Sequence, residues 1–159
     1  MIQDTTLAYL AGFVDGDGSI RVNPKRTRPE SMSATCSISV SNTHPQIPHL
    51  LKLLFGGNLC LTQYKTPNSK PVWRWRLFGV QAANMVRLIY PYLVRKRLQA
   101  ENLLDFEDYR QRLHQERMTK PPGQQGYTRE QRYSFLNYAT RSKELNAFGR
   151  RASGSQNSA

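Results

Sequence analysis

The sequence predicts an α+β fold in which helices cover one face of a four-stranded antiparallel sheet. Near the N-terminus, apolar residues recur with a helical period at Leu7, Leu10 and Val14. Several later segments instead alternate between apolar and polar residues, as strands do. Read in order, the segments give the element order αββαββα, followed by further helices. Such a sheet keeps one face free for solvent or a ligand.

The first element is a helix that Asp4, Thr5 or Thr6 can cap and that Gly16 and Gly18 can end. Small residues form a second stripe beside the apolar one, and such a stripe lets another backbone approach closely. The glycine within the stripe could also be merely tolerated, at a cost of about 1 kcal/mol relative to alanine. The stripe consists of Ala8, Ala11, Gly12 and Asp15.

Four segments are expected to form strands: residues 19–23, 35–41, 59–65 and 72–77. The third is the least clearly phased and the last is the clearest. In the last, Trp73, Trp75 and Leu77 share one face, so Arg74 and Arg76 must point to the other. The segment Pro24 to Ser31 between the first two strands is expected to be a basic turn or loop.

The remaining segments are expected to be helical. The first of them starts near Thr43 to Pro45 and stops at Gly56–Gly57, and Pro91 disturbs the last turn of the next. A capping box of Thr128 and Gln131 starts the final helix. The expected helices cover residues 43–55, 81–93, 95–118 and 128–148. Residues 1–150 are expected to form a single domain with a core over about 4–118, followed by a disordered tail at 151–159.

Composition points to a nucleic-acid partner. The 159 residues carry a formal charge of +12, with a pI of about 10.2, and this excess favours a polyanion over a membrane surface. Mean hydropathy is −0.63, and no apolar run approaches membrane-spanning length. No signal-peptide pattern opens the chain. Cys36 and Cys60 suit a reducing compartment, and without a CxxC or spaced histidines a zinc site is excluded.

The positive charge is concentrated in the middle of the chain. From Ser19 to Arg76 there are nine basic residues against one acid, Glu30, which gives this region a net charge of +8. The outward side chains of the expected strands therefore form a basic face. An ordinary solvated face is the alternative interpretation, and the one-sided charge disfavours it.

Asp15 and Asp17 follow an apolar helix at its C-terminus, where the helix dipole repels carboxylates. A divalent cation would resolve this conflict by binding carboxylate and free carbonyl oxygens together. A calcium loop of the EF-hand type is excluded, because its sixth and twelfth positions would be Ile20 and Arg26. A solvated Asp-Gly turn is the remaining alternative.

The nine residues LAGFVDGDG, Leu10 to Gly18, resemble the motif of the LAGLIDADG homing endonucleases. The resemblance implies a saddle-shaped sheet and packing of motif helices through their small faces. It also implies that Asp17 and the carbonyl of Gly16 bind Mg²⁺, with Mn²⁺ as an expected substitute, at the DNA backbone. Asp15 would lie at the helix–helix junction. A single motif supplies one such acid, so we expect a homodimer that uses Ala8, Ala11, Gly12 and Asp15 as its interface and reads a nearly palindromic site.

The same resemblance assigns two further catalytic residues. Asn42 takes the place of a polar residue near the metal-bound water, with a shorter side chain than the glutamine often found there. Lys96, in PYLVRK, takes the place of a lysine that approaches the scissile phosphate, although a solvated lysine is the simpler alternative. A basic residue expected shortly after Asn42 is replaced by Gln46, and Arg95 or Arg97 would have to compensate.

The expected DNA contacts are the polar and basic side chains of the open sheet face and its loops, because a major groove admits a two-stranded ribbon. They are Arg21, Asn23, Lys25, Arg26, Arg28, Ser37, Ser39, Ser41, Gln63, Lys65, Lys70, Arg74 and Arg76.

The resemblance therefore implies a metal-dependent DNA endonuclease that makes a double-strand break at a long pseudo-palindromic site in intron homing. An RNA maturase that helps its host intron fold is the alternative, and a DNA-binding regulator on the same fold is a weaker third. The expected partners are double-stranded DNA, a second copy of the chain and, for a maturase, intron RNA. The expected location is a chloroplast, a mitochondrion or a bacterial cytoplasm, without secretion.

Overall fold

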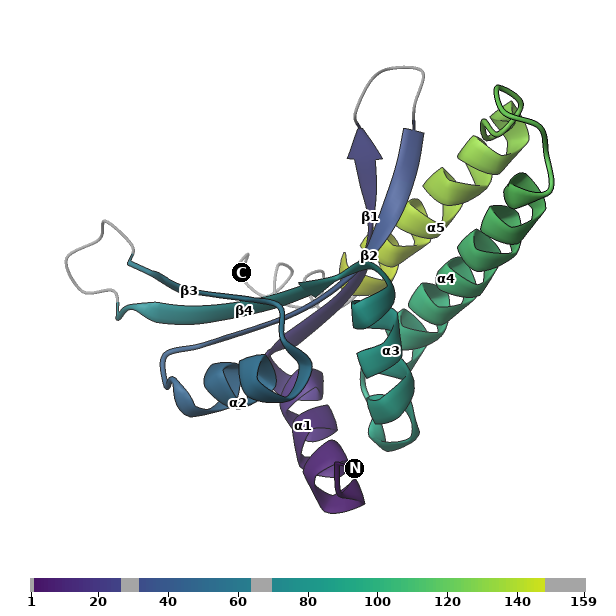
Figure 1. Cartoon of the computed structure of the whole chain (residues 1–159). Helices are drawn as coiled ribbons and strands as arrows, with labels where there is room; N and C mark the ends of the chain where they lie inside the picture. Colours follow the sequence, from purple (N-terminus) through teal and green to yellow (C-terminus); the bar gives the residue numbers. More distant parts are fainter. Residues whose placement is uncertain (1, 27–31, 64–69, 148–159) are drawn as a thin grey trace, which may run out of the picture. The chain divides into compact units, whose positions relative to one another are not determined.

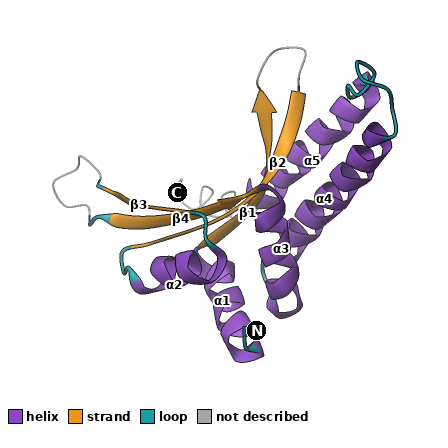
Figure 2. Ribbon diagram, in the orientation of Figure 1, coloured by secondary structure: helices purple, strands orange, loops and turns teal. Residues whose placement is uncertain are grey.

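A computed structural model describes residues 2–26, 32–63 and 70–147 (Figure 1). The order αββαββα and the two further helices are confirmed (Figure 2). The strands are β1 (Gly18–Arg26), β2 (Met32–Asn42), β3 (Asn58–Thr62) and β4 (Val72–Phe78). The helices are α1 (Asp4–Asp17), α2 (Gln46–Phe55), α3 (Gly79–Ile89), the short 3₁₀ helix η1 (Tyr90–Tyr92), α4 (Arg97–Met118) and α5 (Arg129–Ala147).

The strands form one antiparallel sheet in the order β1-β2-β4-β3. The register pairs Ser39 with Arg76 and Arg76 with Asn58, so these three residues form a row across β2, β4 and β3. The neighbouring row, Val40, Trp75 and Leu59, points to the other face, where Val40 and Trp75 are fully buried. The predicted alternation of the fourth strand is therefore confirmed.

The chain divides into two compact units, one of Met1–Ile20 with Ser37–Arg97 and the other of Arg21–Cys36 with Leu98–Ala159. In the first unit, α1, α2 and α3 lie on one side of the strands (Figure 1). Leu10, Ile38, Trp75 and Val86 are fully buried there and form much of its core. The expected single domain over residues 1–150 stays a prediction.

Glycines fix two sharp corners in the first unit. Gly57 follows α2 with a φ of 82°, and a Cβ at this position would lie 2.5 Å from the Arg76 carbonyl oxygen. The indole of Trp75 donates a hydrogen bond of 2.7 Å to the carbonyl of Gly56, which ties the same corner to β4. At the end of α1, a Cβ on Gly18 would meet the Val14 carbonyl at 2.6 Å, so α1 can turn directly into β1.

The second unit is held together by aromatic side chains of α4 and α5 and by Tyr127, which precedes α5. Phe135 contacts Phe106, Tyr109 and Tyr127 with ring centroids 4.9 to 5.9 Å apart. Buried residues of β1 and β2 form hydrogen bonds with these helices. The backbone nitrogen of Val22 donates to the hydroxyl of Ser142 at 2.9 Å, and the thiol of Cys36 donates to Glu107 at 3.8 Å.

Several predicted boundaries are wrong. Pro24 to Arg26 belong to β1 instead of a loop, and this is tolerated because β1 is an edge strand, where proline need not donate a hydrogen bond. The helix expected over 81–93 ends at Ile89 and continues as η1, because Pro91 cannot extend it, and α4 begins at Arg97. The N-cap of α1 is Gln3, without a side-chain cap. The third strand ends at Thr62, and the tail at 151–159 lies outside the described residues.

Candidate active site

Asp17 ends α1 with its side chain exposed, and Asn42 holds it in place. The amide nitrogen of Asn42, at the end of β2, donates to Oδ2 of Asp17 at 2.8 Å. The carbonyl oxygen of Asn42 accepts a hydrogen bond of 2.8 Å from the backbone nitrogen of His44. Because both ends of the amide are used, Asn42 has a fixed orientation that limits how Asp17 can turn.

Asp15, two residues before Asp17, faces inward, with only 7% of its surface exposed. Its Oδ2 accepts hydrogen bonds from the backbone nitrogens of Val94, at 2.7 Å, and Arg95, at 3.2 Å. Its Oδ1 accepts one from the nitrogen of Lys96 at 2.9 Å. The conflict of this carboxylate with the helix dipole is therefore resolved within the chain, by backbone donors in place of a cation.

Lys96 completes the site and is half-buried. Its ammonium donates to the backbone oxygen of Asp15. Burial and the charge of Arg95 lower the pKa of Lys96 from its usual value, and the nearby carboxylates of Asp15 and Asp17 oppose this shift. The positively charged ammonium of Lys96 therefore lies near Asp17.

The structure thus brings together the three residues predicted to be catalytic: Asp17, Asn42 and Lys96. The replacements suggested for the missing basic residue are exposed, as is Gln46 at the start of α2. Arg97 is held by Tyr90: its Nε donates to the hydroxyl at 3.3 Å and its guanidinium lies 5.0 Å from the ring centroid.

The donor set suits a hard divalent cation only in part. Asp17 and the carbonyl of Gly16, in the last turn of α1, are oxygen donors of the kind that Mg²⁺ prefers. Among the described residues, however, no three His, Cys, Asp or Glu side chains gather into a metal site. The remaining ligands of a cation at Asp17 would have to come from water, a phosphate or a second chain.

The uncovered sheet face of the first unit carries predicted DNA contacts. Two rows run across β2, β4 and β3, one of Ser39, Arg76 and Asn58 and the other of Ser41, Arg74 and Cys60. Arg76 is exposed and Ser39 and Ser41 are partly exposed. Ser37 pairs with Phe78 on the same face, and Gln63 and Lys70 are also exposed.

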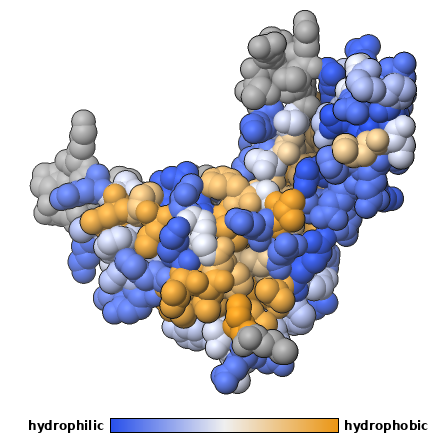
Figure 3. Space-filling view, in the orientation of Figure 1, coloured by the Kyte–Doolittle hydropathy of each residue, from blue (hydrophilic) through white to orange (hydrophobic). Residues whose placement is uncertain are grey.

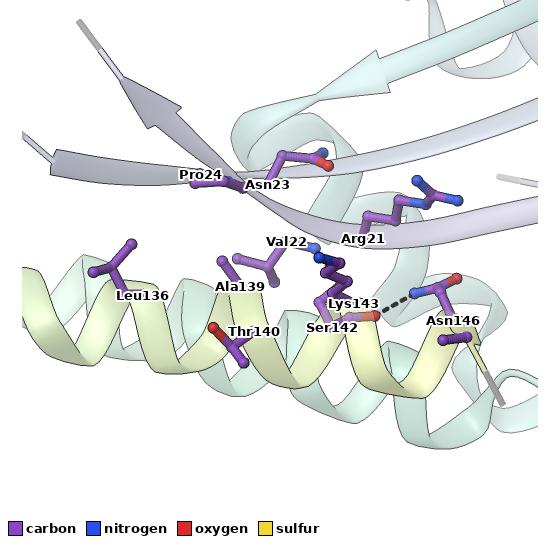
Figure 4. A pocket seen from close by; sticks show the side chains of 11 residues that line it. Arg21, Val22, Asn23, Pro24, Leu136, Ala139, Thr140, Ser142, Lys143 and Asn146 are labelled. Carbon is purple, nitrogen blue, oxygen red and sulfur yellow. Dashed lines mark hydrogen bonds between the residues drawn. The ribbon is translucent and has the colours of Figure 1, made fainter.

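The predicted contacts of the second unit lie on β1. Arg21 and Asn23 extend from β1 away from α5, whereas Val22 points toward it (Figure 4). A groove of about 590 Å³ is lined by residues of β1, Arg21 and Asn23 among them, and by Thr140, Lys143 and Asn146 of α5. Lys25 is exposed. Arg28, Lys65 and the side chain of Arg26 lie outside the part of the chain that the structure describes.

The four residues of the small stripe of α1 differ in exposure. Ala8 and Gly12 are exposed, and a Cβ at Gly12 would have nothing within 4 Å. Ala11 is fully buried in its own chain, and Asp15 is buried against residues 94–96. Of the four predicted interface residues, Ala8 and Gly12 present a free surface, whereas Ala11 and Asp15 are covered by their own chain. The interface itself stays a prediction.

Comparisons with known proteins agree with this fold. The LAGLIDADG endonuclease family model matches residues 10–113. The structure of the homing endonuclease I-CvuI in complex with its target is similar with a TM-score of 0.66 at 19% identity, covering 89% of this chain and 82% of that chain. The homing endonuclease I-TnaI gives a TM-score of 0.62 at 16% identity, with 91% and 94% covered.

A third similar structure is longer. The meganuclease I-SmaMI, bound to uncleavable DNA, gives a TM-score of 0.55 at 14% identity; the match covers 89% of this chain but 43% of that one. A comparison with curated protein sequences gave no match. No helix in the described part of the chain is long and apolar enough to cross a membrane. Since the family model covers well over half of the sequence, the chain belongs to the LAGLIDADG endonuclease family and is a DNA endonuclease.

Proposed function

We propose that this endonuclease cuts both strands of DNA at a specific, nearly palindromic site and uses Mg²⁺ to do so. The observation that carries the proposal is the exposed carboxylate of Asp17, oriented by Asn42 at 2.8 Å and accompanied by Lys96. An exposed, fixed carboxylate beside a cation has no evident use in the fold itself. It is suited to act at a phosphodiester.

A divalent cation held by Asp17 and the Gly16 carbonyl would supply charge neutralisation at the scissile phosphate and an acidified water. The chain's own residues prepare the place for this chemistry. Asn42 restricts the carboxylate of Asp17 to one orientation. Lys96 brings a positive charge that can stabilise the negative charge that develops on the phosphate.

Two copies of the chain are needed in this proposal, because each supplies a single exposed acid at the site. The outer face of α1 is suited to pair with its counterpart, since Ala8 and Gly12 are open and Tyr9 is 56% exposed. Hydrophobic side chains also gather on the surface around α1 and α2 (Figure 3), where Leu53 is 80% exposed. The match to less than half of the longer I-SmaMI chain supports a functional unit of two such folds.

The basic sheet face is proposed to read the DNA. I-CvuI and I-SmaMI, which share this fold, were both solved with DNA. Arginine on a fixed strand can make paired hydrogen bonds to guanine in a major groove. Arg76 has the exposure and the strand geometry for this contact, whereas Lys25 near the tip of β1 is better placed for phosphates.

Intron homing is the proposed biological role, in the organelle or bacterial cell that encodes the chain. The maturase alternative gains no support from the site, because folding an RNA requires no oriented carboxylate such as Asp17. The basic face would suit RNA as well as DNA. An assay of DNA cleavage is therefore needed to distinguish the endonuclease from the maturase.

The test is a cleavage selection on plasmids that carry randomised inserts. The purified protein is incubated with the library and Mg²⁺, and the linear products are sequenced. We expect linear DNA with one related, nearly twofold-symmetric sequence at its ends, and no product when EDTA replaces Mg²⁺. Random breakage, or cleavage that persists in EDTA, would contradict the proposal.

A further inference from the structure

Asp15 forms hydrogen bonds with both the backbone nitrogen and the side-chain ammonium of Lys96. The carboxylate of Asp15 accepts a hydrogen bond from the Lys96 backbone nitrogen at 2.9 Å, and the backbone oxygen of Asp15 accepts one from the Lys96 ammonium. A free lysine side chain has many rotamers, so ordering it costs conformational entropy. The two hydrogen bonds to Asp15 restrict the Lys96 side chain to few rotamers.

The carboxylate also shapes the turn that carries Lys96. Three consecutive backbone nitrogens, from Val94 to Lys96, donate to its two oxygens within 2.7 to 3.2 Å. These donors follow η1 and precede α4, so the side chain of Asp15 fixes the segment between two helices. Asp15 itself is 7% exposed and belongs to the same rigid turn of α1 as Asp17.

We propose that Asp15 is a positioning residue of the active site, which holds Lys96 at a fixed place relative to Asp17. The inference rests on the proposed function, since it assigns Lys96 a part in cleavage. It differs from an interface role, because the carboxylate faces its own chain. An asparagine could not replace it, because an amide has one oxygen, and its nitrogen would face a backbone donor instead of accepting from it.

The first test needs neither DNA nor metal. We expect the amides of Val94 and Lys96 to be protected from hydrogen exchange in the wild-type protein. The Lys96 amine should react more slowly in reductive methylation than exposed Lys70 despite its lowered pKa, because it is half-buried and hydrogen-bonded to the Asp15 backbone oxygen. In Asp15→Asn, exchange of the residue 96 amide should become about tenfold faster, because its hydrogen bond to a charged acceptor is lost. Methylation of the Lys96 amine should also become faster, because the turn is no longer fixed and the ammonium is no longer held at the Asp15 backbone oxygen. Asp105→Asn, an exposed change of the same charge on α4, should alter neither.

The second test is a double-mutant cycle on single-turnover cleavage of a selected site. Asp15→Asn should slow cleavage about 10- to 100-fold, the expected cost of displacing a reacting group, with DNA affinity changed by less than about threefold. Adding Asp15→Asn to Lys96→Met should cost nothing further, because the lysine to be positioned is gone.

Additive effects in the cycle, or a Lys96 amine that reacts as fast as Lys70 in the wild type, would overturn the inference. Even if Asp15→Asn fails to fold, the wild-type exchange and methylation rates test whether Asp15 holds residues 94–96 as the structure shows. A wild-type protein that shows the expected protection but cuts no DNA would overturn the proposed function and with it the role of Lys96, while leaving the hydrogen bonds of Asp15 to Lys96 established.

Discussion

The two compact units each bury a carboxylate, but they satisfy it differently. Asp15 in the first unit is bound by backbone nitrogens of a turn next to the site. Glu107 in the second unit is fully buried and bound by side chains, with Arg110 at 2.6 and 2.9 Å and Gln111 at 3.2 Å. The first arrangement fixes a piece of backbone that carries a functional lysine. The second fixes a helix to the strand residue Cys36.

The residues around the two carboxylates also differ, because those near Asp15 are accessible and those near Glu107 form a network within its unit. Near Asp15, the polar residues Asp17 and Asn42 remain accessible. Around Glu107, the hydrogen-bond partners Cys36, Arg110 and Gln111 all belong to the same unit. We therefore expect exposed residues of the first unit to alter assembly or DNA recognition with little effect on stability, and buried polar residues of the second unit to do the reverse.

The largest effect on assembly is expected from Gly12→Leu. The helix gains up to about 1 kcal/mol of propensity and the monomer has room for the side chain, but the face of α1 that would meet a second copy is obstructed. Self-association should weaken by about 100-fold or more. Sedimentation velocity measures this, with Gln81→Leu on the exposed side of α3 as a control. A mutant that remains dimeric and active would place the interface elsewhere.

Glu107→Gln should lower the free energy of unfolding by about 1.5–3 kcal/mol, because Arg110 loses a charged partner. Urea denaturation followed by circular dichroism gives this value. Cleavage at a temperature where the mutant is folded should be unchanged. A variant that loses activity while keeping its stability would contradict the expectation that buried polar residues of the second unit act on stability alone.

The pH dependence of this difference follows from the pKa of Glu107. Burial alone would raise that pKa, but the hydrogen bonds from Arg110 and Gln111 and the charge of Arg110 outweigh it, so the pKa lies below its usual value of 4.5. The stabilisation is therefore complete above pH 4.5 and is lost as the pH falls through the lowered pKa. The gap between wild type and Glu107→Gln should narrow in acid.

Arg76→Ala should relax base preference at particular, twofold-related positions of the site, by about 1–3 kcal/mol of discrimination. Lys25→Ala should instead weaken binding to all sequences alike and reduce its salt dependence. Selections on randomised targets with both variants separate the two outcomes. If Arg76→Ala keeps every base preference, the open face of β4 does not read the DNA.

The smallest effect is expected at the start of α5. Thr128 and Gln131 form a reciprocal capping box, with hydrogen bonds of 3.2 and 2.9 Å. Thr128→Ala should cost about 1 kcal/mol of stability. Urea denaturation checks this, and no change in base preference should accompany it. A shifted preference would show that the second unit contributes to recognition through this helix.

The fold order was predictable because helical and alternating periods are local properties of the sequence. Asp17, Asn42 and Lys96 were predictable only through the motif and its neighbouring patterns. The role of Asp15 was not, since its partners lie 79 to 81 residues away and a turn that folds back has no periodic signature. Glu107 was missed because its spacing from Arg110 is also typical of exposed helical ion pairs.

The most direct test of the account compares DNA binding and Mg²⁺-dependent cleavage by wild type and Asp17→Asn, on one selected site and with Asp105→Asn as the charge-matched control. Binding in Ca²⁺ should differ by less than about threefold, because one carboxylate is removed from an otherwise intact basic surface. Cleavage by Asp17→Asn should fall at least about 1,000-fold, since the cation loses its carboxylate ligand. Cleavage at the wild-type rate would contradict the assignment of Asp17 and the function built on it.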